Sequence, residues 1–298
     1  ALVYASFNLL PAQDPVRFYA LGSVVALILR VAGLGASFLH LGRPERAWRS
    51  AALWRTSWRS RDVIALPACR GAGAAWGLVH YSGWNPLLFM LGGLQVDLSL
   101  LIGAGGTVLC FALFVCTGMI YACIKFLQEW ATPLTVINYT LFGGASGFLL
   151  AAVFAARQSP ELVEFYGGWA IVMTAIAFVT RSASLVRNAR LKYKSTVQSA
   201  IGIRHARIEQ KAQGAMAGSF NTREFFHGAS PRKYRFVKWV FLVLVFPVPL
   251  LLISAGLATQ AFSLLPAAFL VQYLGLLAER WFFFAQANHP QNLYYQTV

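Results

Sequence analysis

The sequence predicts an all-α, polytopic transmembrane helical bundle of about eight helices. Hydrophobic residues make up 58% of the chain and charged residues only 12%, and the mean hydropathy of +0.58 lies outside the range of soluble globular domains. The apolar stretches recur at about the 20 residues that a helix needs to cross a bilayer. They lack the short alternating segments of an outer-membrane barrel, so the predicted spans are helices.

The predicted spans follow the apolar stretches in chain order. Residues 1–10 are apolar but too short to cross, so they are interpreted as the last part of a first helix. The N-terminus lacks a basic flank followed by a small-residue cleavage site, so no cleavable signal peptide is predicted. No internal repeat is visible, and the whole chain, 1–298, is expected to form one helical membrane domain. Seven further spans are predicted at residues 17–41, 63–81, 98–124, 133–156, 167–187, 238–257 and 262–285.

The basic residues predict which ends of the spans face the cytoplasm. Segment 187–238 is rich in arginine and lysine and holds only two carboxylates, so it is predicted to be a long cytoplasmic loop. The alternation of spans then puts residues 42–62, the turn around Lys125 and the C-terminal tail on the same side. The net charge of +15 is explained either by topology and anionic lipid headgroups or by docking of an acidic soluble partner. No module that reads nucleic acid is visible.

The stretch FLHLGRPERAWRSAALWRTSWRSRD, residues 38–62, gathers titratable and aromatic groups at one membrane surface. His40 ends the second span and Asp62 opens the third, so both are expected at about the same depth. A histidine changes charge near neutral pH and a nearby carboxylate relays its proton, which predicts proton transfer. The alternative is a hydrogen bond that only tethers the loop. Trp54 and Trp58 form either an interfacial aromatic belt or, with the arginines, a site for a polar carbonyl.

Charged side chains within the spans are expected to need partners, because an ionised group is costly in the bilayer. Glu279 and Arg280 adjoin each other in the last span, and adjacent residues on a helix point about 100° apart, so they need not pair. Asp62 is a candidate acceptor for Arg280 on another helix. Arg181 is expected to snorkel toward the cytoplasmic end of its helix.

Cysteines and histidines do not predict a metal site. Their spacings fit neither a zinc site nor a cluster motif, and the four cysteines are interpreted as small core residues: Cys69, Cys110, Cys116 and Cys123. A bis-histidine haem needs two histidines at matching depth on different helices, and His40 with His289 is a poor candidate pair. No haem or metal is therefore predicted on this chain. Arg30 and Arg70 are left without a predicted role.

Longer motifs resemble a known family. The string HLGRP at the end of the second span, the acidic residue in SRD and an arginine followed by aromatics in the last span resemble the membrane anchor of dimethyl sulfoxide reductase-type molybdoenzymes. More narrowly, CTGMIYACIKFLQEWATPLTVINYTLFGGASGF, SFNTREFFHG and AERWFFFAQANHPQNLYY resemble the branch that anchors cytoplasmic sulfite-oxidising molybdoenzymes in sulfur-oxidising and related bacteria. The resemblance runs through nearly the whole chain.

This resemblance implies a complex of three subunits in the bacterial inner membrane. A molybdopterin catalytic subunit and a subunit with several iron–sulfur clusters would dock on the cytoplasmic face, and this chain would exchange electrons with a quinone, ubiquinone or menaquinone. In the family, a histidine of the HLG motif and a carboxylate beyond the next loop are implicated at the quinone site, and these match His40 and Asp62. Asp62 is one methylene shorter than the Glu of the dimethyl sulfoxide reductase anchor. The carboxylate next to Arg280 lies a turn earlier in that family.

The resemblance and the residue patterns together predict two groups of functional residues. Cytoplasmic sulfite oxidation is expected to feed electrons to the quinone, with His40 and Asp62 in proton transfer. The alternatives are the anchor of a quinol-oxidising reductase for dimethyl sulfoxide or polysulfide, a transporter, and a purely structural tether. The predicted quinone-binding residues are His40, Arg43, Trp54, Trp58, Asp62 and Arg280. The residues predicted to dock the iron–sulfur subunit are Arg190, Lys192, Lys194, Arg204, Arg207, Lys211 and Arg223.

Overall fold

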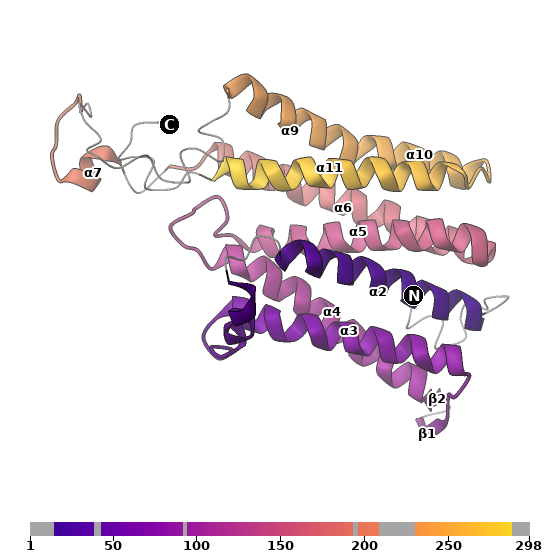
Figure 1. Ribbon diagram of the computed structural model, residues 1–298. Coiled ribbons are helices and arrows are strands. Elements are labelled where there is room, and N and C mark those ends of the chain that lie inside the picture. Colours follow the sequence, from indigo (N-terminus) through magenta and orange to yellow (C-terminus); the bar gives the residue numbers. More distant parts are fainter. Residues whose placement is uncertain (1–14, 39–42, 92–93, 193–195, 209–229, 288–298) are drawn as a thin grey trace.

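Long helices lying side by side make up most of the chain (Figure 1). The computed structural model describes residues 15–38, 43–91, 94–192, 196–208 and 230–287. The long helices are α2 (Pro15–Phe38), α3 (Trp58–Ser82), α4 (Leu98–Ala122), α5 (Pro133–Gln158), α6 (Val163–Ala189), α9 (Pro231–Val245), α10 (Pro247–Ala258) and α11 (Leu264–Gln286). The short elements are η1 (Pro44–Ala51), β1 (Leu87–Leu91), β2 (Leu94–Asp97), η2 (Pro160–Leu162) and α7 (Val197–Ile201).

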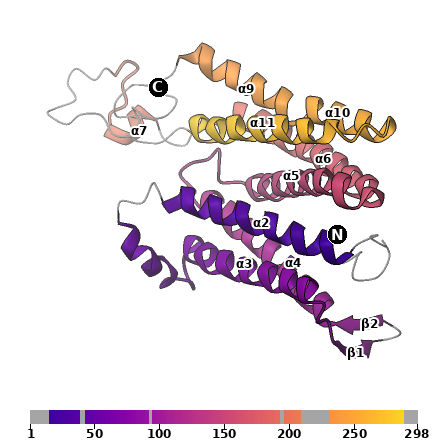
Figure 2. The same ribbon diagram turned by 45° about the vertical axis from the view of Figure 1, so that its right-hand side comes forward.

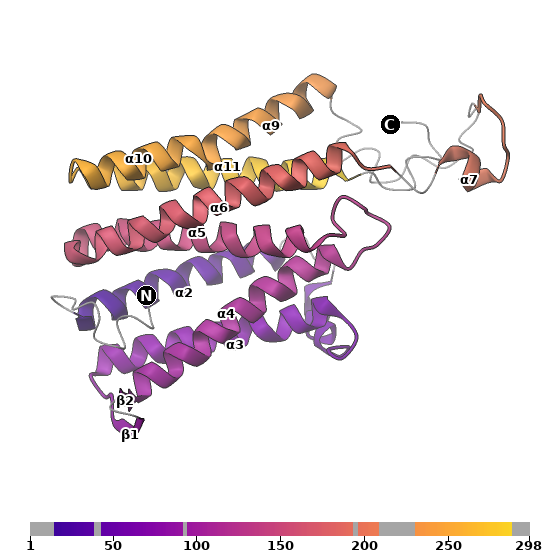
Figure 3. The same ribbon diagram turned by 180° about the vertical axis from the view of Figure 1, so that it is seen from behind.

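Consecutive long helices run in opposite directions, except that α10 continues the direction of α9, so the connections gather at two ends of the bundle (Figures 1 and 3). Helix α5 is central and packs against α4, α6 and α11. At one end lie η1, the 123–132 loop and α7, and at the other lie the β-hairpin and the α10–α11 turn (Figure 2). The end that holds η1, the 123–132 loop and α7 is called the basic end, because its segments carry these cationic residues: Arg43, Arg46, Arg49, Arg55, Arg59, Arg61, Lys125, Arg187, Arg190, Lys192, Arg204, Arg207, Arg232, Lys233, Arg235 and Lys238.

The predicted all-α helical bundle is confirmed. Within the described residues, six segments are long and apolar enough to cross a membrane: Arg17–Ser37, Leu98–Ala122, Pro133–Gln158, Pro160–Ala189, Pro231–Ala258 and Leu264–Gln286. Helix α3 is as long as α4, at 25 residues. It is not among the six segments, because its arginines and Asp62 lower its hydropathy. The predicted helix fragment at 1–10 lies outside the described residues.

Helix α3 begins at Trp58, five residues before the predicted span. Ser57 is its N-cap, and the Ser57 side chain accepts a hydrogen bond from the backbone N–H of Ser60, which satisfies one of the free donors of the first turn. An early start puts Asp62 in the second turn of a helix rather than at the end of a loop. The loop predicted before it holds the 3-10 helix η1.

The span predicted at 238–257 begins seven residues earlier, at Pro231, and is broken in two. Ser230 is the N-cap, and its hydroxyl accepts from the N–H of Lys233 at 3.3 Å. The helix is interrupted at Phe246, because the following Pro247 has no N–H to continue the ladder. The basic first turns of α9 hid this start from a prediction based on hydropathy.

The connection between α3 and α4 contains a β-hairpin that the sequence analysis did not predict. Strands β1 and β2 pair antiparallel, with Leu91 opposite Leu94 and Leu87 opposite Asp97. Asp97 also caps α4 by accepting from the N–H of Leu100 at 2.7 Å, and it accepts a second bond from the Asn85 amide at 2.8 Å. The hairpin is thereby fixed to the start of α4.

The best-packed part of the bundle lies where α5 meets α6. Leu149, Ala152 and Ala155 of α5 and Ala170 of α6 are all fully buried, and they belong to one apolar cluster that extends to Ile253 of α10. Small residues on both helices allow their backbones to approach closely, which is the usual basis of helix packing in a bilayer. This layer holds the α2–α4 side of the molecule to the α9–α11 side.

Replacing Gly118 by alanine is expected to destabilise the protein. A Cβ at this position of α4 would lie 2.8 Å from the Cα of Val136 on α5, so the two helices would have to separate. Overpacking of this kind costs about 1–3 kcal/mol and should lower the midpoint of thermal unfolding in detergent. Gly105→Ala, also on α4, is the control, because a Cβ there meets nothing within 4 Å. Equal midpoints for the two variants would contradict the close approach of α4 and α5.

Candidate functional site

Asp62 lies on the face of α3 that packs against α4, near the basic end. Its Oδ1 accepts a hydrogen bond from the Thr117 hydroxyl of α4 at 2.6 Å, and both residues are part-buried. Sequence reasoning placed the carboxylate at this end but missed Thr117, because nothing in the spacing shows which face of α4 meets α3. His40 lies outside the described residues. The structure therefore gives Asp62 a polar partner, and the pairing of Asp62 with His40 remains a prediction.

Around Asp62, the segment between η1 and α3 forms a surface of tryptophans and arginines. The Arg61 guanidinium donates to the backbone carbonyls of Trp54, at 3.0 Å, and Arg55, at 2.8 Å, and it lies 4.4 Å from the ring centroid of Trp58. Trp54 is 53% exposed. Arg43, the residue before η1, is also exposed. Exposed aromatic and guanidinium groups at this level can contact either lipid headgroups or the carbonyl of a ligand.

Arg280 belongs to a separate ion cluster formed by Arg181 of α6 with Glu279 and Arg280 of α11. The Glu279 carboxylate is fully buried and pairs with Arg181 Nη2 at 2.7 Å, while Arg280 Nε donates to it at 2.7 Å. Glu279 and Arg280, which are adjacent on α11, therefore do pair. The expectation that Arg181 snorkels is wrong, because Arg181 is 3% exposed and ion-paired with Glu279. The carboxylate partner of Arg280 is Glu279, not Asp62.

An aromatic layer lies between the ion cluster and Asp62. The Arg280 guanidinium carbon is 4.3 Å from the ring centroid of Tyr139 on α5, and Tyr139 stacks on Tyr121 of α4 with centroids 5.7 Å apart. Tyr121 is one helical turn beyond Thr117, the partner of Asp62. Residues four apart share a helix face, so the two rings connect the Arg280 guanidinium with the face of α4 that carries Thr117.

A hydrogen-bonded polar group continues from the ion cluster between α5 and α6. The Thr180 hydroxyl donates to Asn138 Oδ1 at 2.7 Å, and Asn138 Nδ2 donates to Ser184 at 2.9 Å. Asn138 and Ser184 are buried and share a small polar crevice with Arg181 and Arg280. Sequence analysis did not select these residues, although Thr180 and Ser184 are spaced one helical turn apart, as partners on one face must be.

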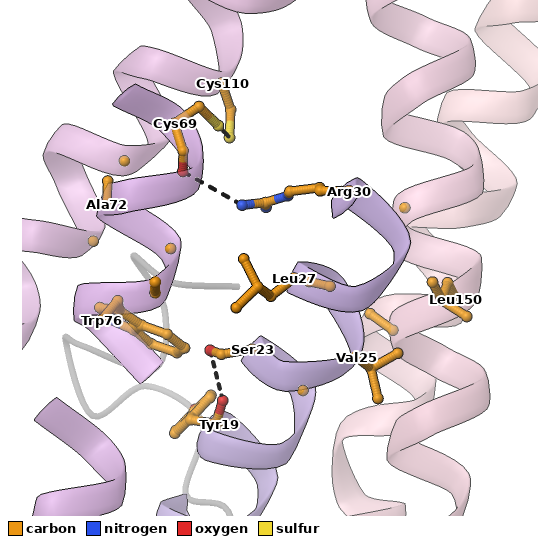
Figure 4. Close-up of a pocket in the computed structure, with 18 of the residues that line it drawn as sticks. Tyr19, Ser23, Val25, Leu27, Arg30, Cys69, Ala72, Trp76, Cys110 and Leu150 are labelled. Carbon is orange, nitrogen blue, oxygen red and sulfur yellow. Dashed lines mark hydrogen bonds between the residues drawn. The ribbon is translucent and has the colours of Figure 1, made fainter. Parts of the chain in front are cut away.

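Arg30 and Arg70, which had no predicted role, bind each other's helices halfway along the bundle. Arg70 Nη2 donates to the carbonyl of Arg30 on α2 at 3.0 Å, and Arg30 Nη1 donates to the carbonyl of Cys69 on α3 at 3.4 Å. Arg30 also lines a cavity of about 280 Å³ between α2, α3, α4 and α5, to which Tyr166 of α6 contributes (Figure 4).

Two free thiols meet at the wall of this cavity. The Sγ atoms of Cys69 on α3 and Cys110 on α4 are 2.9 Å apart, and both residues line the cavity. They are seven residues from Asp62 and Thr117 respectively, which is two turns along each helix. The α3–α4 interface is therefore marked by two side-chain pairs, one of oxygens and one of sulfurs, about 10 Å apart along the helices.

The thiol pair is expected to form a disulfide on mild oxidation. A disulfide needs the two sulfurs at about 2.05 Å, so only a small shift is required, and an added azodicarboxamide oxidant would accept the two electrons and two protons. Cys69 and Cys110 should lose alkylation together and regain it with dithiothreitol, while exposed Cys123 stays alkylated throughout. In Cys69→Ser, Cys110 should remain alkylated. Independent behaviour of the two thiols, read by mass spectrometry, would contradict the α3–α4 register.

The sequence matches the family described as DMSO reductase anchor subunit (DmsC) over residues 11–285. The chain belongs to this family. It is 58% identical over 297 residues to a subunit of the sulfite dehydrogenase of Allochromatium vinosum, an alignment that covers 99% of this chain and 91% of the relative. No solved structure matches. The resemblance read from the motifs is thereby confirmed, and the chain is a membrane anchor subunit of the DMSO reductase type.

An anchor subunit needs a surface for its partners, and the basic end offers exposed cations. Four of the predicted docking residues lie in the described part of the chain, and all four are exposed: Arg190, Lys192, Arg204 and Arg207. Lys194, Lys211 and Arg223 lie outside the described residues. The helix α6 extends to Ala189 and α9 begins at Pro231, so the connection between them is shorter at both ends than the predicted loop 187–238.

The family is one of molybdoenzyme subunits. The described residues contain no group of three or more His, Cys, Asp and Glu side chains that could hold a metal ion. His80 instead hydrogen-bonds Ser99 through Nε2 at 2.8 Å and packs on Trp76, with ring centroids 4.3 Å apart. Its contacts are those of a packed structural histidine.

Proposed function

We propose that this chain is the quinone-binding membrane anchor of a three-subunit molybdenum and iron–sulfur oxidoreductase that passes electrons from cytoplasmic sulfite oxidation to the membrane quinone pool. Membership of the anchor family and the similarity to a sulfite dehydrogenase subunit support the kind of complex. The observation that carries the quinone assignment is Asp62, a hydrogen-bonded carboxylate inside the bundle close to the basic end.

Sidedness follows from charge. The basic end carries most of the cationic side chains of the described chain, and by the positive-inside rule it faces the cytoplasm of the bacterial inner membrane. Exposed cations at 190–192 and 204–207 can bind an acidic surface of the iron–sulfur subunit, and that contact brings the donor of electrons to the end of the bundle that holds Asp62. Molybdopterin and the iron–sulfur clusters belong to the partner subunits.

The residues near Asp62 suit a reaction in which a quinone takes up two electrons and two protons. Asp62 holds a proton at a carboxylate oxygen that Thr117 orients, and His40 is proposed to exchange that proton with the cytoplasm. Arg43 or Arg280 would stabilise negative charge on the reduced oxygen by charge-assisted hydrogen bonds. Trp54 and Trp58 would flank the ring. Arg280 would approach the reduced oxygen from the α5 side, where its guanidinium lies over the ring of Tyr139.

The test is to purify the detergent-solubilised complex through a tag on this chain, identify its subunits and measure sulfite-dependent quinone reduction. Molybdenum and iron–sulfur subunits should co-purify, and a quinone-site inhibitor should stop electron transfer to quinone while leaving sulfite oxidation with an artificial acceptor intact. Quinol-dependent reduction of dimethyl sulfoxide or polysulfide, without sulfite oxidation, would contradict the direction proposed. A chain that emerges alone and transports solutes in liposomes would overturn the anchor assignment to this complex.

A further inference from the structure

The cavity between α2, α3, α4 and α5 is apolar along most of its wall and charged at one point (Figure 4). Leu27 and Ala72 lie on two of its sides and Leu150 on a third, while the Arg30 side chain extends into the space toward Cys69. Its volume of about 280 Å³ is at the small end of small-molecule sites, which are roughly 300–1,000 Å³. The space admits one ring-sized group.

Arg30 is the feature that points to a ligand. Its guanidinium has five N–H donors, and the one hydrogen bond recorded for it is the long one to the Cys69 carbonyl at 3.4 Å. Within the described residues, no carboxylate forms an ion pair with Arg30. A cation at this depth without a counter-ion is costly and usually marks a functional site. The other N–H groups of the Arg30 guanidinium are therefore available to an acceptor oxygen of a ligand inside the cavity.

A glycine makes room for this arginine. A Cβ at position 73 of α3 would lie 2.7 Å from Arg30 Nη1, so the guanidinium takes this position where residue 73 has no side chain. On the α5 wall, Gly147 faces open space, and a Cβ there would meet no atom within 4 Å. Val25, on the α2 rim, is exposed, so an apolar tail can leave the cavity toward lipid.

We propose that this cavity is a second binding site for the headgroup of a membrane quinone, with one ring carbonyl accepting hydrogen bonds from Arg30. The identity of the ligand rests on the proposed function, while the site itself is separate from the residues predicted near the basic end. A quinone combines the three properties that the cavity requires: a single ring, a strong carbonyl acceptor and an apolar tail. A free anion or the phosphate of a phospholipid would leave the apolar walls of the cavity without contacts.

This second site lies on the same helix interface as Asp62. Cys69, whose carbonyl binds Arg30, is two turns from Asp62 on one face of α3, a distance of about 10 Å along the helix. Headgroups in the two positions would therefore lie in line along α3 and α4. The cavity would hold a quinone between the lipid and the carboxylate at which the quinone is reduced.

The test uses the whole purified complex in lipid nanodiscs and a photoreactive azidoquinone. The label should attach to the cavity walls, on α2 peptides around Val25–Leu29 or α5 peptides around Leu150–Phe154. Gly147→Leu fills the cavity and should reduce this labelling at least tenfold. Gly105→Leu is the matched control, because it adds the same side chain on a lipid-exposed face outside the cavity, and its labelling should equal that of wild type.

A second variant keeps the proposal testable if Gly147→Leu does not fold. Arg30→Gln removes the charge and most donors and should also reduce cavity labelling at least tenfold, whereas Arg157→Gln, an exposed arginine of α5, should not. Excess unlabelled quinone should displace the label. Displacement by phosphatidylglycerol but not by quinone would overturn the proposal in favour of a lipid site.

Failure of this inference is distinguishable from failure of the proposed function. A wild-type complex that reduces quinone with sulfite, but is labelled only within residues 45–62, would overturn the second site and leave the proposed function standing. Labelling of α2 and α5 in a complex without sulfite-dependent quinone reduction would do the reverse.

Discussion

Asp62→Asn is expected to lower quinone-dependent turnover by a factor of about 10²–10⁴, the usual contribution of a positioned proton donor or acceptor. The amide occupies the same space and still accepts a hydrogen bond from Thr117, so the α3–α4 interface should persist. The loss should therefore appear in electron transfer to quinone and not in the yield of assembled complex. Sulfite oxidation with an artificial acceptor, assayed on the same preparation, reports whether the partner subunits remain active.

Two further variants sharpen this experiment. Glu45→Gln changes an exposed carboxylate of η1 at the same end of the bundle and should leave turnover within about twofold. Thr117→Val removes the hydroxyl but keeps the carboxylate, so its effect should be smaller than that of Asp62→Asn. If Asp62→Asn turned over quinone like wild type, Asp62 would be a structural hydrogen-bond acceptor and the proposed proton transfer would be wrong.

Glu279→Leu is expected to be the most destabilising single substitution in the chain. It leaves Arg181, which is 3% exposed, without its carboxylate, and it removes the carboxylate partner of Arg280. Breaking a buried ion pair by removing one partner costs about 3–5 kcal/mol, because an uncompensated charge stays buried. The variant should unfold at a markedly lower temperature in detergent, and little of it should reach the membrane in folded form.

Arg181→Met is the informative comparison for the ion cluster. It removes one of two guanidiniums, so Glu279 keeps Arg280 as a partner, and methionine packs on Phe241, over which the Arg181 guanidinium lies at 5.6 Å. Its cost should be well below that of Glu279→Leu. Equal losses for the two variants would mean that the packing of α6 on α11 matters more than the charge balance.

The fold was predictable because bilayer thickness fixes the length of an apolar helix, and this constraint is visible in composition alone. The residues at which the helices begin were less predictable. Trp58 and Pro231 begin helices whose first turns are basic, and a hydropathy criterion excludes such turns although arginine and lysine are good helix formers. The hairpin around Leu87–Leu91 was hidden for the opposite reason, because an apolar strand at a membrane surface has no alternating pattern.

For the site, the sequence predicted only how deep each residue lies along the bundle, not which side chains are in contact. Span boundaries put Asp62 at the basic end, and they put Arg280 at a similar level. Which side chains meet depends on the rotation of each helix about its axis, and a single sequence does not give that angle. Hence the sequence did not predict Thr117 as the partner of Asp62, and it suggested Asp62 instead of Glu279 as the partner of Arg280. It gave Arg30 no role, because its contacts depend on how α2 packs against α3.

The place of Asp62 in the second turn of α3 has a consequence for energy conservation. If the carboxylate takes its protons from the end of the bundle that receives the electrons, both arrive at the quinone from one side of the membrane. No net charge then crosses the bilayer in this step. The complex would load the quinone pool without itself building a membrane potential, and any energy stored from sulfite would be captured later, where quinol is reoxidised.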